Sequence, residues 1–181
     1  MQPAVPIDVD ETSGIWRTDG LPMVYLPRHF LVNNHLAVEA ALGRDAYRAV
    51  LRTATAKSAI EWCEAQVQGK GLDPEATFRH YFQRLSQRGW GQFSIDRLDT
   101  SEGRGTISIR NSIFTLGAQR GGAQRGSTPP LCYMFEGFMT GAFRFLLQAA
   151  HPEREIRALE CAETQCAGDG AHDHCRFAFS G

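Results

Sequence analysis

The chain has 181 residues, of which 43% are hydrophobic and 22% are charged, and its formal net charge is -1 at pH 7. This size and composition predict one globular domain and exclude an intrinsically disordered chain. The near-neutral charge argues against a nucleic-acid partner, and no apolar run predicts a membrane span or a secretory signal. We therefore expect a soluble, cytoplasmic protein without nucleic-acid or membrane partners.

The first part of the chain divides into an arm and a domain. Residues 1–20 are polar and contain two prolines, which predicts a loosely ordered N-terminal arm. Residues 21–181 are then expected to form a single domain. A short helix is predicted at 35–42, where a glycine follows its end.

Two longer helices follow. Apolar residues recur at helical spacing over 45–68, and two glycines follow this stretch. The second helix is predicted at 74–87, with Asp73 as its N-cap and Pro74 at its first position.

The apolar period then changes from helical to alternating. The segments GWGQFSIDRLD (89–99) and TISIRN (106–111) alternate apolar and polar residues across a turn, which predicts an antiparallel hairpin. Residues 117–130 are rich in Gly, Gln, Arg, Ser and Pro, which favours a flexible surface loop.

The C-terminal third is expected to contain one long helix and a second hairpin. The helix is predicted at 131–150, where Gly137 and Gly141 stand one turn apart and allow another backbone to come close. Two strands, at 155–163 and 174–180, flank a Gly-containing turn. The order of helices, hairpin, helix and hairpin predicts an α+β domain with mixed helices and an antiparallel sheet.

The five cysteines point to chemistry in the C-terminal part. An odd number of cysteines in a non-secreted chain argues against a disulfide framework. Cys161, Cys166 and Cys175 fall within fifteen residues, and a metal site is the first explanation for such a cluster.

Four residues form the predicted metal-ligand set. Glu163 and Cys166 stand near the end of the first C-terminal strand, and Cys175 opens the returning strand, so a tight turn brings them together. Cys132 stands at the start of the long helix, whose positive end should favour the thiolate. Thiolates and a carboxylate are good zinc ligands, so we expect zinc at Cys132, Glu163, Cys166 and Cys175.

Plainer interpretations stay open beside this one. Cysteine is often a small buried hydrophobe, and this interpretation is favoured for Cys63 on a helix stripe and for Cys161 inside a strand. His172 and His174 could replace Glu163 or Cys132 as ligands, although surface turn residues are the simpler interpretation for both.

Several motifs resemble the 4-vinyl-reductase-type domain family, also described as predicted small-molecule or hydrocarbon-binding proteins. The motifs are CYMFEGFMTGAF at 132–143, E-x-x-C at 163–166, and G-x-x-x-x-C-R-F ending at Phe177, together with the middle hairpin. The likeness covers about residues 30–180. It implies the ligand-binding fold of the sensor domains of aromatic-responsive bacterial activators and of TRAPP subunits, and commonly a homodimer.

The resemblance also implies a structural zinc ion held by Cys132, Glu163, Cys166 and Cys175, beside the effector pocket. Two departures matter. The spacing to the last cysteine is one residue longer here, and Ile109 stands where those sensors carry a tryptophan that contacts phenol. Phenol recognition therefore does not transfer.

The favoured function is the binding or sensing of a small hydrophobic or aromatic molecule. A protein partner would then recognise the ligand-bound arrangement of the domain. The expected ligand pocket comprises His80, Trp90, Ile109, Tyr133 and Phe138. The alternative is an accessory or enzyme of tetrapyrrole vinyl-group reduction. No nucleotide-binding glycine motif, nucleophile elbow or C-x-x-C redox pair is found, so a binding module is favoured over an enzyme.

Overall fold

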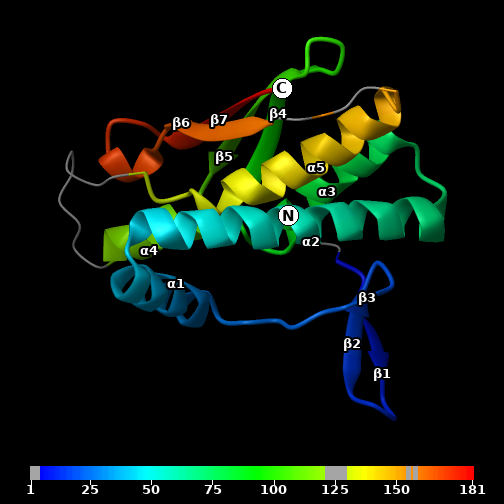
Figure 1. Cartoon of the computed structure of the whole chain (residues 1–181). Coiled ribbons are helices and arrows are strands. Elements are labelled where there is room, and N and C mark those ends of the chain that lie inside the picture. The colour runs from blue at the N-terminus through cyan, green and yellow to red at the C-terminus, as the bar shows by residue number, and fades with distance from the viewer. Residues whose placement is uncertain (1–4, 121–129, 154–155, 157–158) are drawn as a thin grey trace.

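The computed structural model describes residues 5–120, 130–153, 156 and 159–181, with no side chains for 117–120. Its elements confirm the predicted α+β class (Figure 1). In chain order they are β1 (Asp8–Asp10), β2 (Ile15–Thr18), β3 (Leu21–Pro22), α1 (Arg28–Leu42), α2 (Arg44–Lys70), α3 (Pro74–Gln87), β4 (Gln92–Asp99), β5 (Arg104–Arg110), α4 (Ile113–Arg120), α5 (Met134–Ala150), β6 (Glu160–Gln165), the 3-10 helix η1 (Ala167–Asp169) and β7 (His174–Ser180).

The main sheet joins the two predicted hairpins. Its four strands are antiparallel in the order β4-β5-β7-β6, so β5 pairs with β7 across the two hairpins. Ile107 and Ile109 of β5 are fully buried and alternate with more exposed polar residues. α5 covers this inner face, where Phe143 packs against Phe179 of β7 with ring centroids 4.5 Å apart.

The long helices α2 and α5 pack with their backbones in close contact, as the glycine spacing predicts. A Cβ atom added at Gly141 would lie 2.2 Å from the carbonyl oxygen of Ala56, and one at Gly137 would lie 2.6 Å from that of Arg52. Figure 1 shows the two helices crossing the centre of the molecule. The absence of a side chain at both glycines therefore sets the distance between these helices.

The predicted boundaries of α3 are confirmed. The helix runs from Pro74 to Gln87, and the Asp73 carboxylate accepts a hydrogen bond from the backbone N–H of Ala76. This cap satisfies one of the free N–H groups of the first turn. The apolar stripe of α3 is buried at Phe78 and Phe82, which fixes the rotation of the helix against the core.

The prediction of a loosely ordered arm is wrong for the described part of 1–20. β1, β2 and β3 form a three-stranded antiparallel sheet that projects from the body on the opposite side of α2 from the main sheet (Figure 1). Asp10 shapes its first turn by accepting hydrogen bonds from the backbone N–H groups of Thr12 and Ser13. Asp19 then ties this sheet to α2 and α3 through ion pairs.

Two further boundaries differ from the predictions. α4 extends through Arg120, so residues 117–120 are helical and not a loop; its first turn is anchored because Ile113 and Phe114 are buried in the core. The remainder of the predicted loop, 121–129, lies outside the described residues. α5 begins at Met134, so Cys132 precedes the helix and does not open it, although its carbonyl accepts the hydrogen bond of Phe135 N–H.

Two smaller differences complete the comparison. The helix predicted at 35–42 begins earlier, at Arg28. The first C-terminal strand begins at Glu160, and most of the expected 155–159 segment lies outside the described residues. Among the described residues, no helix has the length and apolar character needed to cross a membrane.

Candidate functional site

The cysteine cluster lies where β6, β7 and the segment before α5 meet. Cys175 points to the inner face of β7 and pairs in register with Ile109 of β5. Glu163 and Cys166 are three residues apart, a spacing that puts side chains on opposite faces of a regular strand. The β6–β7 register shifts between Glu163 and Gln165. This irregularity returns Cys166 to the buried side that Glu163 occupies.

Three of the four predicted ligands come together closely. One ligand atom from each of Cys132, Glu163 and Cys175 lies within 4.8 Å of the other two. The Cys132 and Cys175 Sγ atoms are 3.5 Å apart, and Glu163 Oε2 accepts a 2.9 Å hydrogen bond from Cys132 N–H. Cys166 adjoins this triad through side-chain contacts with Glu163 and Cys175.

The electrostatics of the cluster favour protonated groups in the absence of a cation. Burial, and then the neighbouring Cys166, raise the pKa of Glu163 to about 8. Burial also raises the pKa of the Cys132 thiol. The sequence predicted that the helix N-terminus would lower this pKa and favour the thiolate, but the effect of burial is larger. The contact with Cys132 raises the pKa of Cys175, and the contact with Cys175 raises that of Cys166. A divalent cation would displace these protons.

The geometry fits a metal ion. Glu163 Oε1 is buried and has no hydrogen-bond partner among the described residues, so it is available as a ligand. Zinc–sulfur bonds of about 2.3 Å in a tetrahedron separate two sulfurs by about 3.8 Å, close to the 3.5 Å between Cys132 and Cys175. All five cysteines are free thiols. Cys132, Glu163 and Cys175 therefore form a possible metal-binding triad.

The sequence analysis missed the groups that support this cluster. The Ser112 hydroxyl lies 3.0 Å from Cys132 Sγ. The side chain of Glu136 is fully buried, and its two oxygens accept hydrogen bonds of 2.8 and 2.5 Å from Arg48 of α2. Glu136 also accepts a hydrogen bond from the backbone N–H of Glu163. A glutamate on the apolar stripe of a helix was the available sequence signal.

The other two cysteines lie outside the triad. Cys63 is fully buried on α2, and burial raises its pKa to about 12. Cys161 is buried in β6, with its Sγ atom 3.9 Å from Met139 Sδ. His172 in the turn and His174 at the first position of β7 each lie within hydrogen-bond distance of a neighbouring aspartate, Asp169 and Asp173 respectively.

The residues of the predicted ligand pocket fall into two groups. Trp90 and Phe138 pack with ring centroids 5.7 Å apart and line a partly open hollow of about 330 Å³ beneath the N-terminal segment. His80 lies near this hollow, with its ring 5.5 Å from that of Trp62. The lining residues are Leu21, Pro22, Met23, Ser58, Glu61, Trp62, Tyr81, Leu85, Arg88, Trp90 and Phe138.

The remaining two pocket candidates lie elsewhere. Ile109 is in the core beside the cysteine cluster, as its pairing with Cys175 shows. Tyr133 is buried in a separate aromatic group, where its hydroxyl donates to Glu39 and its ring lies 5.1 Å from that of His35. The assignment of these five residues to one ligand pocket stays a prediction.

The chain belongs to the family described as Domain of unknown function (DUF5943), whose match covers residues 1–96. No curated protein matches the chain. The fold is similar to that of the phenol-responsive sensory domain of the transcription activator PoxR, described in a crystal structure with phenol. That likeness has a TM-score of 0.73 at 18% identity and covers 96% of this chain and 84% of the other.

Two further solved structures are more distant. One is a trafficking protein particle complex subunit 3 from Naegleria fowleri, covalently bound to palmitic acid (TM-score 0.48, 12% identity, 84% of this chain and 93% of that one). The other is a vinyl-4-reductase family protein from Methanocaldococcus jannaschii (TM-score 0.49, 11% identity, 87% and 83%). The PoxR likeness confirms the predicted relation to aromatic-responsive sensor domains at the level of the fold.

Proposed function

We propose that the chain is a non-catalytic module that binds a small hydrophobic or aromatic molecule and is stabilised by a structural zinc ion. The observation that carries the binding function is the hollow of about 330 Å³ beside Trp62, Tyr81, Trp90 and Phe138. A concave site with aromatic walls and a few polar groups is the usual form of a small-molecule site. A fold shared with a phenol-responsive sensory domain supports the same function.

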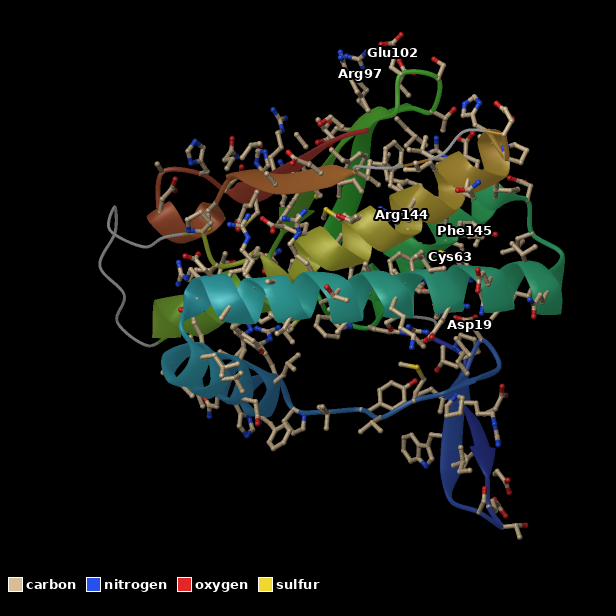
Figure 2. All side chains as sticks on the ribbon, viewed as in Figure 1. Asp19, Cys63, Arg97, Glu102, Arg144 and Phe145 are labelled. Carbon is tan, nitrogen blue, oxygen red and sulfur yellow. The ribbon has the colours of Figure 1, made fainter. Side chains whose placement is uncertain are left out.

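The ligand-binding proposal is tested with a neutral aromatic probe, 2-naphthol, by isothermal titration calorimetry. Phe138→Ala removes one wall of the hollow and should weaken binding about tenfold. Phe145→Ala is the matched control, since Phe145 lies on the same helix and lines a different groove between α2 and α5 (Figure 2). Equal loss in both variants would contradict the placement of the site. Binding of a porphyrin in place of 2-naphthol would support the tetrapyrrole alternative.

In this proposal zinc is held by Cys132, Glu163, Cys166 and Cys175. The unpartnered Glu163 oxygen and the adjacent thiols support it, and four protein ligands leave no open position for catalysis. Zinc would tie the β6–β7 hairpin to the start of α5. It supplies a structural crosslink, and these residues assemble only in the folded chain.

Metal analysis of the purified protein tests the zinc proposal. We expect about one zinc per chain, and Cys166→Ser should lose both the metal and much of the stability. Cys161→Ser is the matched control, because Cys161 is a buried thiol of β6, the strand that ends just before Cys166, and contacts Met139 and not the triad. It should keep the metal. Full zinc occupancy in Cys166→Ser would remove Cys166 from the ligand set.

We also propose that two copies of the chain associate in the cytoplasm. Among the residues that the structure describes, the strongly exposed large hydrophobic side chains all fall within residues 7–50, and Val24 is 76% exposed. Such a concentration is typical of an interaction surface. Free thiols at all five cysteines fit a reducing compartment. Light scattering across a concentration series measures the oligomeric state, and a strictly monomeric chain would contradict the dimer.

A further inference from the structure

Two residues that line the hollow, Arg88 and Trp62, carry buried nitrogen donors without a hydrogen-bond acceptor among the described residues. The side chain of Arg88 is 9% exposed, and its Nε and Nη2 atoms make no hydrogen bond among the described residues. Trp62 Nε1 is buried and equally unpartnered. Both residues belong to the wall of the same hollow, and Arg88 also borders a second hollow of about 310 Å³ that shares Met23 and Trp90. Buried donors are normally paired, so each one calls for an explanation.

The nearest carboxylate is already used by other cations. Asp19 lies at the junction of the N-terminal sheet and α2 (Figure 2). It accepts hydrogen bonds of 2.8 and 2.9 Å from Arg84 and one of 2.5 Å from Lys70. Arg88 Nη2 reaches only within 3.5 Å of Asp19 Oδ2. One carboxylate therefore faces three cationic side chains, and the region around Arg88 keeps excess positive charge.

Glu61, the acidic residue in the lining of the hollow, does not neutralise the positive charge of Arg88. Glu61 lines the hollow, but its side chain is 62% exposed and pairs with Lys57 at 3.7 Å, one turn away on α2. His80 Nε2 lies 3.8 Å from Asp19 and adds a polar group on the cationic side. Arg88 therefore presents to the hollow a positive charge that Asp19 balances only in part, while Glu61 faces Lys57.

The two Arg88 nitrogens without a hydrogen bond, Nε and Nη2, are the pair of atoms with which two other arginines of this chain bind a carboxylate. Arg48 uses Nε and Nη2 to hold both oxygens of Glu136, and Arg84 uses the same two atoms to hold Asp19. This side of a guanidinium matches a carboxylate with two parallel hydrogen bonds. In Arg88 this side makes no hydrogen bond among the described residues, and its only described charge contact is the 3.5 Å ion pair of Nη2 with Asp19.

We propose that the hollow binds an aromatic carboxylate, with Arg88 Nε and Nη2 holding the carboxylate and Trp62 Nε1 donating to a ligand acceptor. The aromatic walls at Tyr81, Trp90 and Phe138 take the apolar body. The inference rests on the proposed small-molecule-binding function and names the class of its ligand.

The test compares 2-naphthoate with its neutral counterpart 2-naphthamide, by calorimetry at pH 7 on the full chain. The wild type should bind 2-naphthoate about tenfold more tightly than 2-naphthamide, because a charge-assisted pair is stronger than a neutral one. Arg88→Gln should abolish this preference, because the charge-assisted pair with the carboxylate of 2-naphthoate is lost. Arg79→Gln is the matched control, since Arg79 lies on the exposed face of α3 and pairs with Glu75; it should keep the preference.

The outcomes separate the two proposals. Equal or tighter binding of 2-naphthamide by the wild type would overturn the carboxylate inference and leave the binding function intact. A preference for 2-naphthoate that survives Arg88→Gln would overturn the role of Arg88. No binding of either probe up to about 1 mM would overturn both proposals. If Arg88→Gln fails to fold, as judged by circular dichroism, Trp62→Phe replaces it and should weaken 2-naphthoate binding several-fold.

Discussion

Replacement of Gly141 by alanine probes the contact on which the helical layer depends. The added Cβ atom would lie 2.2 Å from Ala56 O, 2.7 Å from Ala56 Cα and 2.8 Å from Ala56 C, whereas ordinary contacts begin at 3.4 Å. These are backbone atoms of α2, so no side chain can rotate away and the two helices must separate. Overpacking of this kind costs about 1–3 kcal/mol or more, and the higher helix propensity of alanine offsets about 1 kcal/mol.

We expect Gly141→Ala to lower the free energy of unfolding by about 2 kcal/mol and Tm by about 4–8 °C. Urea and thermal unfolding followed by circular dichroism measure both. Gly69→Ala is the matched control, because Gly69 is likewise a helical glycine, in α2, and a Cβ atom there would meet nothing within 4 Å. That variant should gain up to about 1 kcal/mol. If Gly141→Ala were as stable as Gly69→Ala, the close approach of α2 and α5 would be refuted.

Two charged groups give further predictions. Arg48→Met leaves the fully buried Glu136 carboxylate without its partner and should destabilise by about 2–3 kcal/mol in urea at pH 7, while the double variant Arg48→Met/Glu136→Met recovers part of the loss. An undiminished midpoint in the single variant would argue against this pair. Burial lowers the pKa of His35, so the unfolded chain binds its proton more tightly and stability should fall as pH drops below about 6.5. His35→Phe should reduce this loss between pH 7 and 5, whereas His29→Phe, at an exposed position on α1, should not; identical pH profiles would contradict the assignment.

Local signals gave accurate predictions for several elements. The boundaries of α3 follow from Asp73 and Pro74, whose capping chemistry acts within one turn. The predicted proximity of Glu163 and Cys175 follows from two strands joined by a short turn, because hairpin partners are near in sequence. The close approach of α2 to α5 was visible in the spacing of Gly137 and Gly141.

Other features depend on partners that are distant in sequence. The bulge that returns Cys166 to the buried side depends on the pairing of β6 with β7, which residue spacing does not reveal. The N-terminal sheet is held against α2 and α3 by the ion pairs of Asp19 with Lys70 and Arg84, which lie 51 and 65 residues away in the sequence. Asp19 belongs to the polar stretch 1–20 that was predicted to be a loosely ordered arm, and its distant partners are not visible in that stretch.

The sequence by itself determined the class of fold and the chemical character of the cysteine cluster, because helix periodicity, capping and hairpin spacing are short-range properties. Only the tertiary structure decided that Arg88 and Trp62 share one hollow with unpaired donors. The physical reason is that a donor is paired, and a charge is balanced, by whichever groups lie next to it in space. Around this hollow those groups come from α2, α3, α5 and the N-terminal segment, which are far apart in the sequence.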